Sequence, residues 1–188
     1  MKVICIDVDG VLADFVLGFR VLANALYNAP IYTTKEQSKW AFEDLTRAQE
    51  TSIWNKIKLS STFWTTLIPL ATTQELIKLQ LLERLENLYF ITNRPGYKAK
   101  HQTEEWLCTQ GFKNPTVIQQ PSGEKGEIVK ALKATYMIDD KPENIENILM
   151  KSPTTRTYIL TQLYNLTHRT DAIRINTLTE FISDLNAT

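Results

Sequence analysis

Residues 3–15, Val-Ile-Cys-Ile-Asp-Val-Asp-Gly-Val-Leu-Ala-Asp-Phe, decide the fold of this chain. Their first four residues form an apolar run that predicts a short strand buried on both faces, as in a parallel sheet. The run ends in Asp7 and Asp9, and Gly10 then allows the backbone to turn. Because parallel α/β sheets bind ligands at the carboxyl ends of their strands, Asp7 is expected on the floor of a crevice. Asp9, two residues later, should point the same way.

A second acidic pair repeats this pattern. Asp139 and Asp140 end the apolar run 136–138. Two such strands side by side would bring four carboxylates into one crevice, where burial strengthens their mutual repulsion. A hard divalent cation relieves that repulsion, and Mg²⁺ is the usual choice where phosphate is also bound. Without the second pair, the first stretch would be equally consistent with a strand and an ordinary Asp-Gly turn.

The rest of the chain alternates between helical and strand patterns, which predicts an α/β fold with a doubly wound parallel sheet. After the first strand, the expected elements are helices at 73–85, 97–110, 126–133, 142–150 and 177–185, and strands at 88–92, 116–118, 136–139, 157–160 and 172–175. Residues 16–70 contain helical patterns at 14–29 and 46–58 but no convincing strand. We therefore expect a core of residues 1–15 and 71–188, with residues 16–70 inserted after the first strand as a small helical cap.

Composition excludes several classes of function. The 188 residues are 43% hydrophobic and carry a formal net charge of zero, which argues against long nucleic acid or anionic membrane as a partner. No apolar run approaches membrane-spanning length, and Met1-Lys2 leaves no room for a signal peptide before the first strand, so we expect a cytoplasmic protein. Cys5 and Cys108 fit no metal-ligand spacing and are expected to be reduced, packed thiols. The sequence leaves the oligomeric state open, a homodimer included.

Four segments together resemble a known superfamily. In order and spacing they are similar to the four motifs of the haloacid-dehalogenase superfamily of phosphohydrolases. The segments are Asp7-Val8-Asp9-Gly10-Val11, Ile91-Thr92-Asn93, a lysine, and Ile138-Asp139-Asp140. Within it, the chain resembles the 5′(3′)-deoxyribonucleotidase family at further segments: Asp7 to Phe15, Ser52-Ile53-Trp54, Phe63-Trp64, Leu67-Ile68-Pro69, Ile138 to Pro142, and Gln162-Leu163-Tyr164-Asn165. That family hydrolyses deoxyribonucleoside monophosphates with Mg²⁺ beneath a small helical cap.

The acidic residues can then be assigned expected roles in catalysis and metal binding. Asp7 is the candidate nucleophile, because a carboxylate that attacks a phosphoryl group splits one hard hydrolysis into two easier steps. Asp9 is the candidate general acid and base. The resemblance implies that Mg²⁺ is held by Asp7, by Asp9 through its backbone carbonyl, and by Asp140, with Asp139 supporting the site without binding the ion. Asp139 and Asp140 also suit a helix N-terminus before Lys141-Pro142, and the two roles are compatible.

The phosphate is expected to meet groups after the second strand and a lysine. The Thr92 hydroxyl and the Asn93 amide are suited to hydrogen-bond the transferring phosphoryl oxygens. Arg94 could bind phosphate in a bidentate manner or could equally be a solvated loop charge. Lys125 is the candidate phosphate-holding lysine because it lies one element before the second acidic pair, and Lys98 and Lys100 compete with it.

The aromatic residues of the cap suggest the substrate. Phe15, Phe63 and Trp64 match pocket positions of the resembled family and could stack on a planar base, although aromatic residues at helical spacing often form core instead. Trp40 and Trp54 lie nearby in sequence. The segment 31–49 resembles nothing specific, and Asn93-Arg94 departs from the expected dipeptide, which leaves base and sugar preference open.

The leading hypothesis is therefore a Mg²⁺-dependent phosphomonoesterase that hydrolyses (deoxy)ribonucleoside monophosphates through an aspartyl-phosphate. The alternatives within enzymes are a phosphatase of another small phosphorylated metabolite or of nucleic-acid 3′-phosphate ends. A catalytically silent phosphate-binding module is disfavoured because both first-strand acids are present. A receiver-type signalling domain is disfavoured by the long insertion after the first strand.

Overall fold

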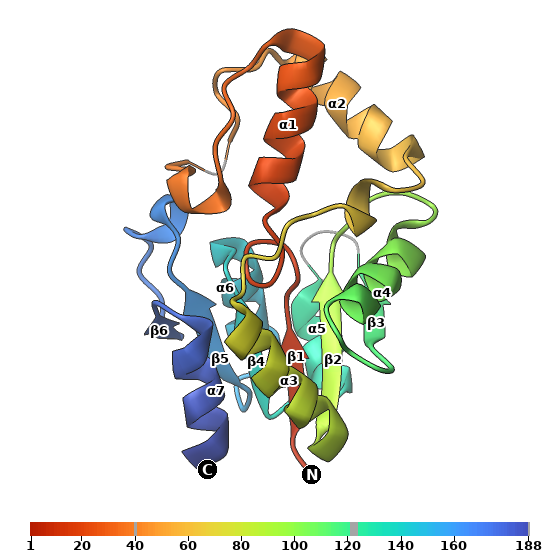
Figure 1. The fold of residues 1–188 in the computed structure, drawn as a ribbon. Coiled ribbons are helices and arrows are strands. Elements are labelled where there is room, and N and C mark those ends of the chain that lie inside the picture. The colour runs from red at the N-terminus through yellow and green to blue at the C-terminus, as the bar shows by residue number, and fades with distance from the viewer. Residues whose placement is uncertain (40, 121–123, 188) are drawn as a thin grey trace.

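A single six-stranded parallel sheet forms the centre of the molecule (Figure 1). The computed structural model describes residues 1–39, 41–120 and 124–187. Trp40 lies outside the described residues, and so does Ser122-Gly123, where the sequence predicts a turn before the helix at 126–133. The strand order is β3-β2-β1-β4-β5-β6. The strands are β1 (Val3–Ile6), β2 (Asn87–Thr92), β3 (Thr116–Gln119), β4 (Tyr136–Asp139), β5 (Arg156–Leu160) and β6 (Ile173–Ile175). The doubly wound parallel α/β fold is confirmed.

Strand β1 lies in the middle of the sheet and is buried on both faces. Ile4 is in register with Leu88 of β2 and with Tyr136 of β4. Because side chains alternate along a strand, Ile4 and Ile6 join the larger apolar core, whereas Cys5 joins a smaller core on the other face. The carboxyl ends of β1, β2 and β4 therefore lie next to one another. This arrangement places the two acidic pairs at one edge of the sheet, as the sequence predicts.

Helices cover both faces of the sheet (Figure 1). The larger core contains residues of α3 (Thr73–Leu85), α4 (Ala99–Thr109) and α7 (Leu178–Ala187), and the smaller core contains residues of α5 (Lys125–Ala131) and α6 (Pro142–Lys151). These elements agree with the sequence expectation except at their ends. No helix in the described part of the chain combines the length and apolar character needed to cross a bilayer.

Both cysteines are free thiols, but only one is packed. Cys5 is buried in β1, where burial raises its pKa to about 12. Cys108 is exposed on α4, so the expectation that it packs in the interior is wrong. The physical reason is its position on the solvent side of the helix, next to the buried Trp106 and Leu107.

The cap segment, residues 16–70, lies above the carboxyl ends of the strands (Figure 1). It contains most of α1 (Phe15–Tyr27), the helix α2 (Arg47–Leu59) and the 3-10 helices η1 (Thr34–Glu36) and η2 (Phe63–Thr65). Its described residues contribute no strand to the sheet. The division into core and cap stays our interpretation of this arrangement.

Asp14 joins the cap segment to the core at the start of α1. It is the N-cap residue of α1, and its buried Oδ1 accepts hydrogen bonds from the backbone N–H of Leu17 (3.0 Å). The same oxygen accepts from the backbone N–H (2.9 Å) and the hydroxyl (2.6 Å) of Thr34. One carboxylate therefore fixes both the direction of α1 and the return of the chain at η1.

Helix α4 holds the far end of the cap segment. The indole N–H of Trp106 donates to the carbonyl of Leu67 at 2.8 Å. Gln102 is buried and bonds twice: its Oε1 accepts from the backbone N–H of Trp64 (3.0 Å), and its Nε2 donates to the carbonyl of Ser60 (2.9 Å). The cap segment is thus attached to the core on two sides of the crevice.

Replacing Asp14 with alanine should destabilise the protein by about 3 kcal/mol, because the helix cap is lost and two buried donors of Thr34 are left without an acceptor. The matched control is Thr46→Ala at the exposed N-cap of α2, which should cost about 1 kcal/mol. Urea denaturation measures both. Equal losses for the two variants would contradict the role given to Asp14.

Candidate active site

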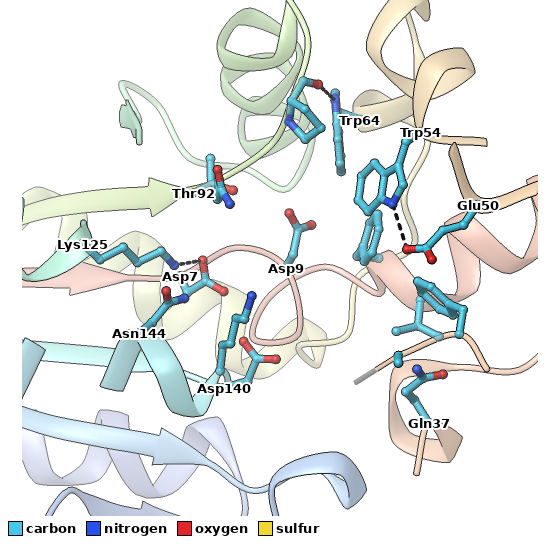
Figure 2. A pocket seen from close by; sticks show the side chains of 17 residues that line it. Asp7, Asp9, Gln37, Glu50, Trp54, Trp64, Thr92, Lys125, Asp140 and Asn144 are labelled. Carbon is cyan, nitrogen blue, oxygen red and sulfur yellow. Dashed lines mark hydrogen bonds and ion pairs between the residues drawn. The ribbon is translucent and has the colours of Figure 1, made fainter. Parts of the chain in front are cut away.

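A cavity of about 370 Å³ lies between the strand ends and the cap segment. Its floor contains Asp7, Thr92, Lys125 and Asp140, and its cap side contains aromatic rings (Figure 2). The floor residues come from four different places along the chain, which the parallel order of β1, β2 and β4 brings together.

Lys125 connects two acidic residues at the floor. Its Nζ lies 2.5 Å from Oδ1 of Asp7 and 2.6 Å from Oδ2 of Asp139, and all three side chains are buried. Burial by itself lowers the pKa of Lys125, but the charges of Asp139 and Asp7 more than offset this, so its pKa lies above the usual value. Lys98 and Lys100 are exposed. Of the three candidate lysines, the structure brings Lys125 to the acidic residues.

Asp7 lies at the end of β1 with its backbone N–H bonded to the carbonyl of Ile138 at 3.0 Å. Burial raises the pKa of Asp7 well above its usual value; Lys125 opposes this shift, whereas the neighbouring carboxylates add to it. An isolated Asp7 carboxylate would therefore be costly, and Lys125 compensates part of that cost.

Asp139 and Asp140 have different partners, although they are adjacent. Asp139 accepts from Lys125, from the backbone N–H of Lys141 (2.8 Å) and from the amide of Asn144 (3.1 Å). Asp140 lines the cavity and accepts a hydrogen bond from the Tyr164 hydroxyl. Burial, reinforced by the charge of Asp139, raises the pKa of Asp140 to about 7.

Gly10 allows this packing. Its φ of +81° is a left-handed conformation that favours glycine. A Cβ at this position would also collide with the carboxylate of Asp140. The turn after β1 can therefore approach the end of β4 only because residue 10 has no side chain.

The three buried carboxylates form a candidate metal centre. Asp7, Asp139 and Asp140 each offer an oxygen that lies within 4.8 Å of the others. Asp139 accepts from Lys125 and Asn144 and is not among the residues that line the cavity, whereas Asp140 and Asp7, although Asp7 is also paired with Lys125, both face the cavity. Hard oxygen donors in a buried, negatively charged group suit Mg²⁺, so the residues present fit the expected ion.

Arg94 lies beneath the cavity wall and pairs with Asp9. Its guanidinium binds the Asp9 carboxylate in a bidentate manner, with Nη2 2.9 Å from Oδ1 and Nε 3.0 Å from Oδ2. The Arg94 side chain is fully buried, donates to the Thr103 hydroxyl at 3.1 Å and lies 4.9 Å from the Trp64 ring centroid. The interpretation of Arg94 as a solvated loop charge is therefore wrong. Its guanidinium is directed at Asp9, and Arg94 is not among the residues that line the cavity.

Thr92 and Asn93 both reach the cavity at the end of β2. The Oγ1 of Thr92 is buried and has no hydrogen-bond partner among the described residues. A buried hydroxyl without a partner is costly, and the position beside Asp7 and Lys125 suits an anionic oxygen of a ligand. Asn93 is exposed at the rim.

The aromatic wall consists of Phe15, Trp54 and Trp64. The ring of Phe15 lies 5.5 Å from that of Trp54 and 5.8 Å from that of Trp64, with interplanar angles of 18° and 25°. Phe63, which we expected in this wall, instead lines a separate hollow with Gly18 and other residues of the outer side of the cap segment. The ring of Phe63 meets that of Trp64 in a T-shaped contact, with an interplanar angle of 85°, and the two neighbours line different hollows.

Sequence reasoning missed several residues that line the cavity. The sequence pattern assigns Trp54 no role and predicts Phe42 only as an apolar anchor of its segment, and it does not single out Gln37, Glu50 or Asn144. Trp54 and Glu50 are four residues apart on α2, a spacing that places them on one helix face. This four-residue spacing is the feature of the sequence from which the two residues could have been predicted to lie together.

Residues 1–186 match the family described as "5' nucleotidase, deoxy (Pyrimidine), cytosolic type C protein". The chain belongs to this family. The 5′ nucleotidase family is one of phosphoric monoester hydrolases, and the resemblance to the haloacid-dehalogenase superfamily is thereby confirmed. Thr92, Asp7 and Asp140 thus lie in the cavity of a member of a nucleotidase family.

Individual relatives agree with this placement. A Bacillus cereus protein named as a nucleotidase is 27% identical over 124 residues, which is 64% of this chain and 63% of that protein. The match therefore spans less than two thirds of that relative's length. A haloacid-dehalogenase family hydrolase from Deinococcus radiodurans, solved with phosphate and sodium, has a TM-score of 0.60 at 11% identity and covers 100% of this chain and 96% of its own. A Pseudomonas syringae hydrolase also has a TM-score of 0.60, at 12% identity, with 100% and 99% covered. Because both sequence identities are low, these two structures show only that this chain shares their fold.

Replacing Lys125 with methionine should destabilise the metal-free protein by about 3 kcal/mol, because Asp7 and Asp139 would stay buried without their cation. The control Lys100→Met removes an exposed lysine and should change the stability by less than about 0.5 kcal/mol. Urea denaturation in the presence of a chelator measures the difference. Equal stabilities of the two variants would show that Lys125 does not hold the acidic residues together.

Proposed function

We propose that this protein is a Mg²⁺-dependent phosphomonoesterase that hydrolyses (deoxy)ribonucleoside monophosphates through an aspartyl-phosphate intermediate. One observation carries the proposal: the Asp7 carboxylate, the Lys125 ammonium and the Thr92 hydroxyl, which has no partner among the described residues, line the floor of a cavity with an aromatic wall. Nucleophile, phosphate donors and a surface for a base are thereby within one site.

In the first step Asp7 attacks phosphorus, and the bond to the leaving oxygen breaks. Lys125 and the Thr92 hydroxyl donate hydrogen bonds to the phosphoryl oxygens, with the Asn93 amide at the rim. Asp9 gives a proton to the leaving oxygen of the nucleoside. In the second step Asp9 takes a proton from water, which attacks the aspartyl-phosphate and releases inorganic phosphate with Asp7 restored.

Arg94 supports the proposed role of Asp9 by holding its carboxylate between a buried guanidinium and the cavity. Asp139 has a comparable supporting role, because it fixes Lys125 and is itself held by Asn144. Neither Arg94 nor Asp139 needs to contact the substrate to matter for the reaction.

The residues that would hold Mg²⁺ are Asp7 and Asp140, with the backbone carbonyl of Asp9. When bound, the ion supplies positive charge that neutralises the phosphate oxygens and allows an anionic nucleophile to approach. Burial, reinforced by the neighbouring carboxylates, raises the pKa of both Asp7 and Asp140, and a cation between them would offset both effects.

A nucleoside monophosphate fits the two ends of the cavity better than a small sugar phosphate does. The rings of Phe15, Trp54 and Trp64 provide apolar area for a planar base, whose burial positions the phosphate. The neutral net charge supports a small substrate over nucleic-acid 3′ ends. The family description and the composition also support a cytoplasmic enzyme without a membrane partner.

The purified protein should release phosphate from a panel of nucleoside 5′- and 3′-monophosphates with Mg²⁺, and EDTA should remove at least about 99% of the activity. Excess Mg²⁺ should restore it. Turnover that persists in EDTA, or no release from any nucleotide, would contradict the proposal. Colorimetric detection of inorganic phosphate is sufficient.

Asp7→Asn serves as the catalytic control in that assay. The variant should lose at least about a thousandfold in kcat, since an amide cannot form the acyl-phosphate. Lys100→Met, which changes an exposed lysine outside the cavity, should retain the wild-type rate.

A further inference from the structure

Each of the two carboxylates that would hold the cation has one oxygen engaged by a neighbouring side chain. Oδ1 of Asp7 accepts from Nζ of Lys125 at 2.5 Å, as Figure 2 shows. Oδ2 of Asp140 accepts from the hydroxyl of Tyr164. The other oxygen of each carboxylate, Oδ2 of Asp7 and Oδ1 of Asp140, is then the one left for a cation.

Tyr164 approaches Asp140 from outside the cavity. It lies in the 3-10 helix η3 (Leu163–Asn165), after β5, and is not among the residues that line the cavity. Burial, reinforced by the charge of Asp140, raises the pKa of Tyr164, so the hydroxyl keeps its proton and remains a donor. Tyr164 therefore acts on a bound ion through Asp140 and without touching the substrate.

The neighbours of Tyr164 hold η3 in place. Asn165 is buried and donates to the backbone carbonyl of Asp140 at 2.7 Å. Gln162 is also buried and donates to the backbone carbonyl of Gly10 at 2.9 Å. These two bonds fix η3 against the turns that follow β4 and β1. The Tyr164 hydroxyl is thereby held in position, and the Asp140 carboxylate cannot turn without losing its bond to it.

We infer that Tyr164 makes the cation site selective for Mg²⁺ over Ca²⁺ by restricting Asp140 to one coordinating oxygen. The inference rests on the proposed function, because it concerns the cation of the same site. Ca²⁺ takes about six to eight oxygen ligands and accepts both oxygens of one carboxylate, whereas Mg²⁺ requires a small octahedral site and keeps several waters. Two carboxylates that each offer one oxygen suit Mg²⁺ and give Ca²⁺ too few ligands.

Tyr164 differs in this respect from Lys125, which restricts Asp7 in a similar way. Lys125 also neutralises two buried carboxylates, so its removal changes the charge of the site as well as the number of free oxygens. The Tyr164 hydroxyl is neutral. Removing it releases one oxygen of Asp140 and leaves the charge of the site unchanged, which makes Tyr164 the residue at which selectivity can be tested separately.

Isothermal titration calorimetry of Mg²⁺ and of Ca²⁺ into the chelator-treated protein measures the preference as the ratio of the two dissociation constants. The wild-type protein should bind Mg²⁺ at least about tenfold more tightly than Ca²⁺. Tyr164→Phe should reduce this preference at least about tenfold, because Asp140 can then bind Ca²⁺ through both oxygens. A general loosening of the site would instead weaken both ions and leave the ratio unchanged.

Tyr158→Phe is the matched control. The Tyr158 hydroxyl also donates to an aspartate, Asp184, and neither residue lines the cavity. The control variant therefore loses the same kind of bond and should keep the wild-type ratio, and circular dichroism checks the fold of both variants. A wild-type protein that does not bind Mg²⁺ or prefers Ca²⁺, or a ratio that Tyr164→Phe leaves unchanged, would overturn the inference. Because no turnover is measured, the result stands even if the proposed hydrolysis fails.

A crystal structure of the wild-type protein with Mg²⁺ is a second test, which does not depend on the folding of a variant. One oxygen of Asp140 should bind the ion while the other keeps its hydrogen bond to Tyr164. Both oxygens of Asp140 on the ion, or a Tyr164 hydroxyl turned away from Asp140, would overturn the inference.

Discussion

The ion pairs of Lys125 with Asp7 and Asp139 are the interaction on which the site depends. They join α5 to the ends of β1 and β4, the two strands at the middle of the sheet. A buried carboxylate is stable only when positive charge or several donors lie close to it. Lys125 supplies that charge for two acids at once, and its own pKa is raised in return. Asp140 lies next to this pair without a basic partner of its own at hydrogen-bond distance, in the described residues.

This charge distribution also explains why the surrounding backbone is so constrained. Gly10 must lack a side chain for the β1 turn to pass Asp140, and Gln162 fixes that turn by donating to the Gly10 carbonyl at 2.9 Å. Asn165 donates to the backbone carbonyl of Asp140 at 2.7 Å from the η3 segment (Leu163–Asn165). The loop after β5 thus holds the end of β4 in two ways, because the Tyr164 hydroxyl of the same segment donates to the Asp140 carboxylate. The segment Gln162 to Asn165 resembled the deoxyribonucleotidase family, and these contacts give that resemblance a physical basis.

The sequence predicted the sheet, the place of most elements and the convergence of Asp7, Asp139, Asp140 and Lys125. The aspartates were predictable because strand periodicity is a local pattern and the carboxyl ends of parallel strands lie at one edge of the sheet, whereas Lys125 was predictable from the motif order of the resembled superfamily. The cap side was less predictable. Gln37 and Glu50 belong to segments separated by loops, and they line one cavity because of how α1, η1 and α2 pack. Phe63 and Trp64 show the same difficulty, because one 3-10 helix directs adjacent rings to different hollows. Arg94 could not be placed from its loop position, since its burial arises from Asp9, Thr103 and two tryptophans that lie elsewhere in the chain.

The account's central claim is that Asp7 and Asp140 keep their carboxylates together because a divalent cation completes the charge balance that Lys125 begins. Calorimetric titration of Mg²⁺ into the chelator-treated protein tests this most directly. We expect about one ion per chain with a Kd in the micromolar to millimolar range, and an Asp140→Asn protein that binds at least about tenfold more weakly. No heat of binding with the wild-type protein at millimolar Mg²⁺, or an affinity unchanged in the variant, would contradict the claim.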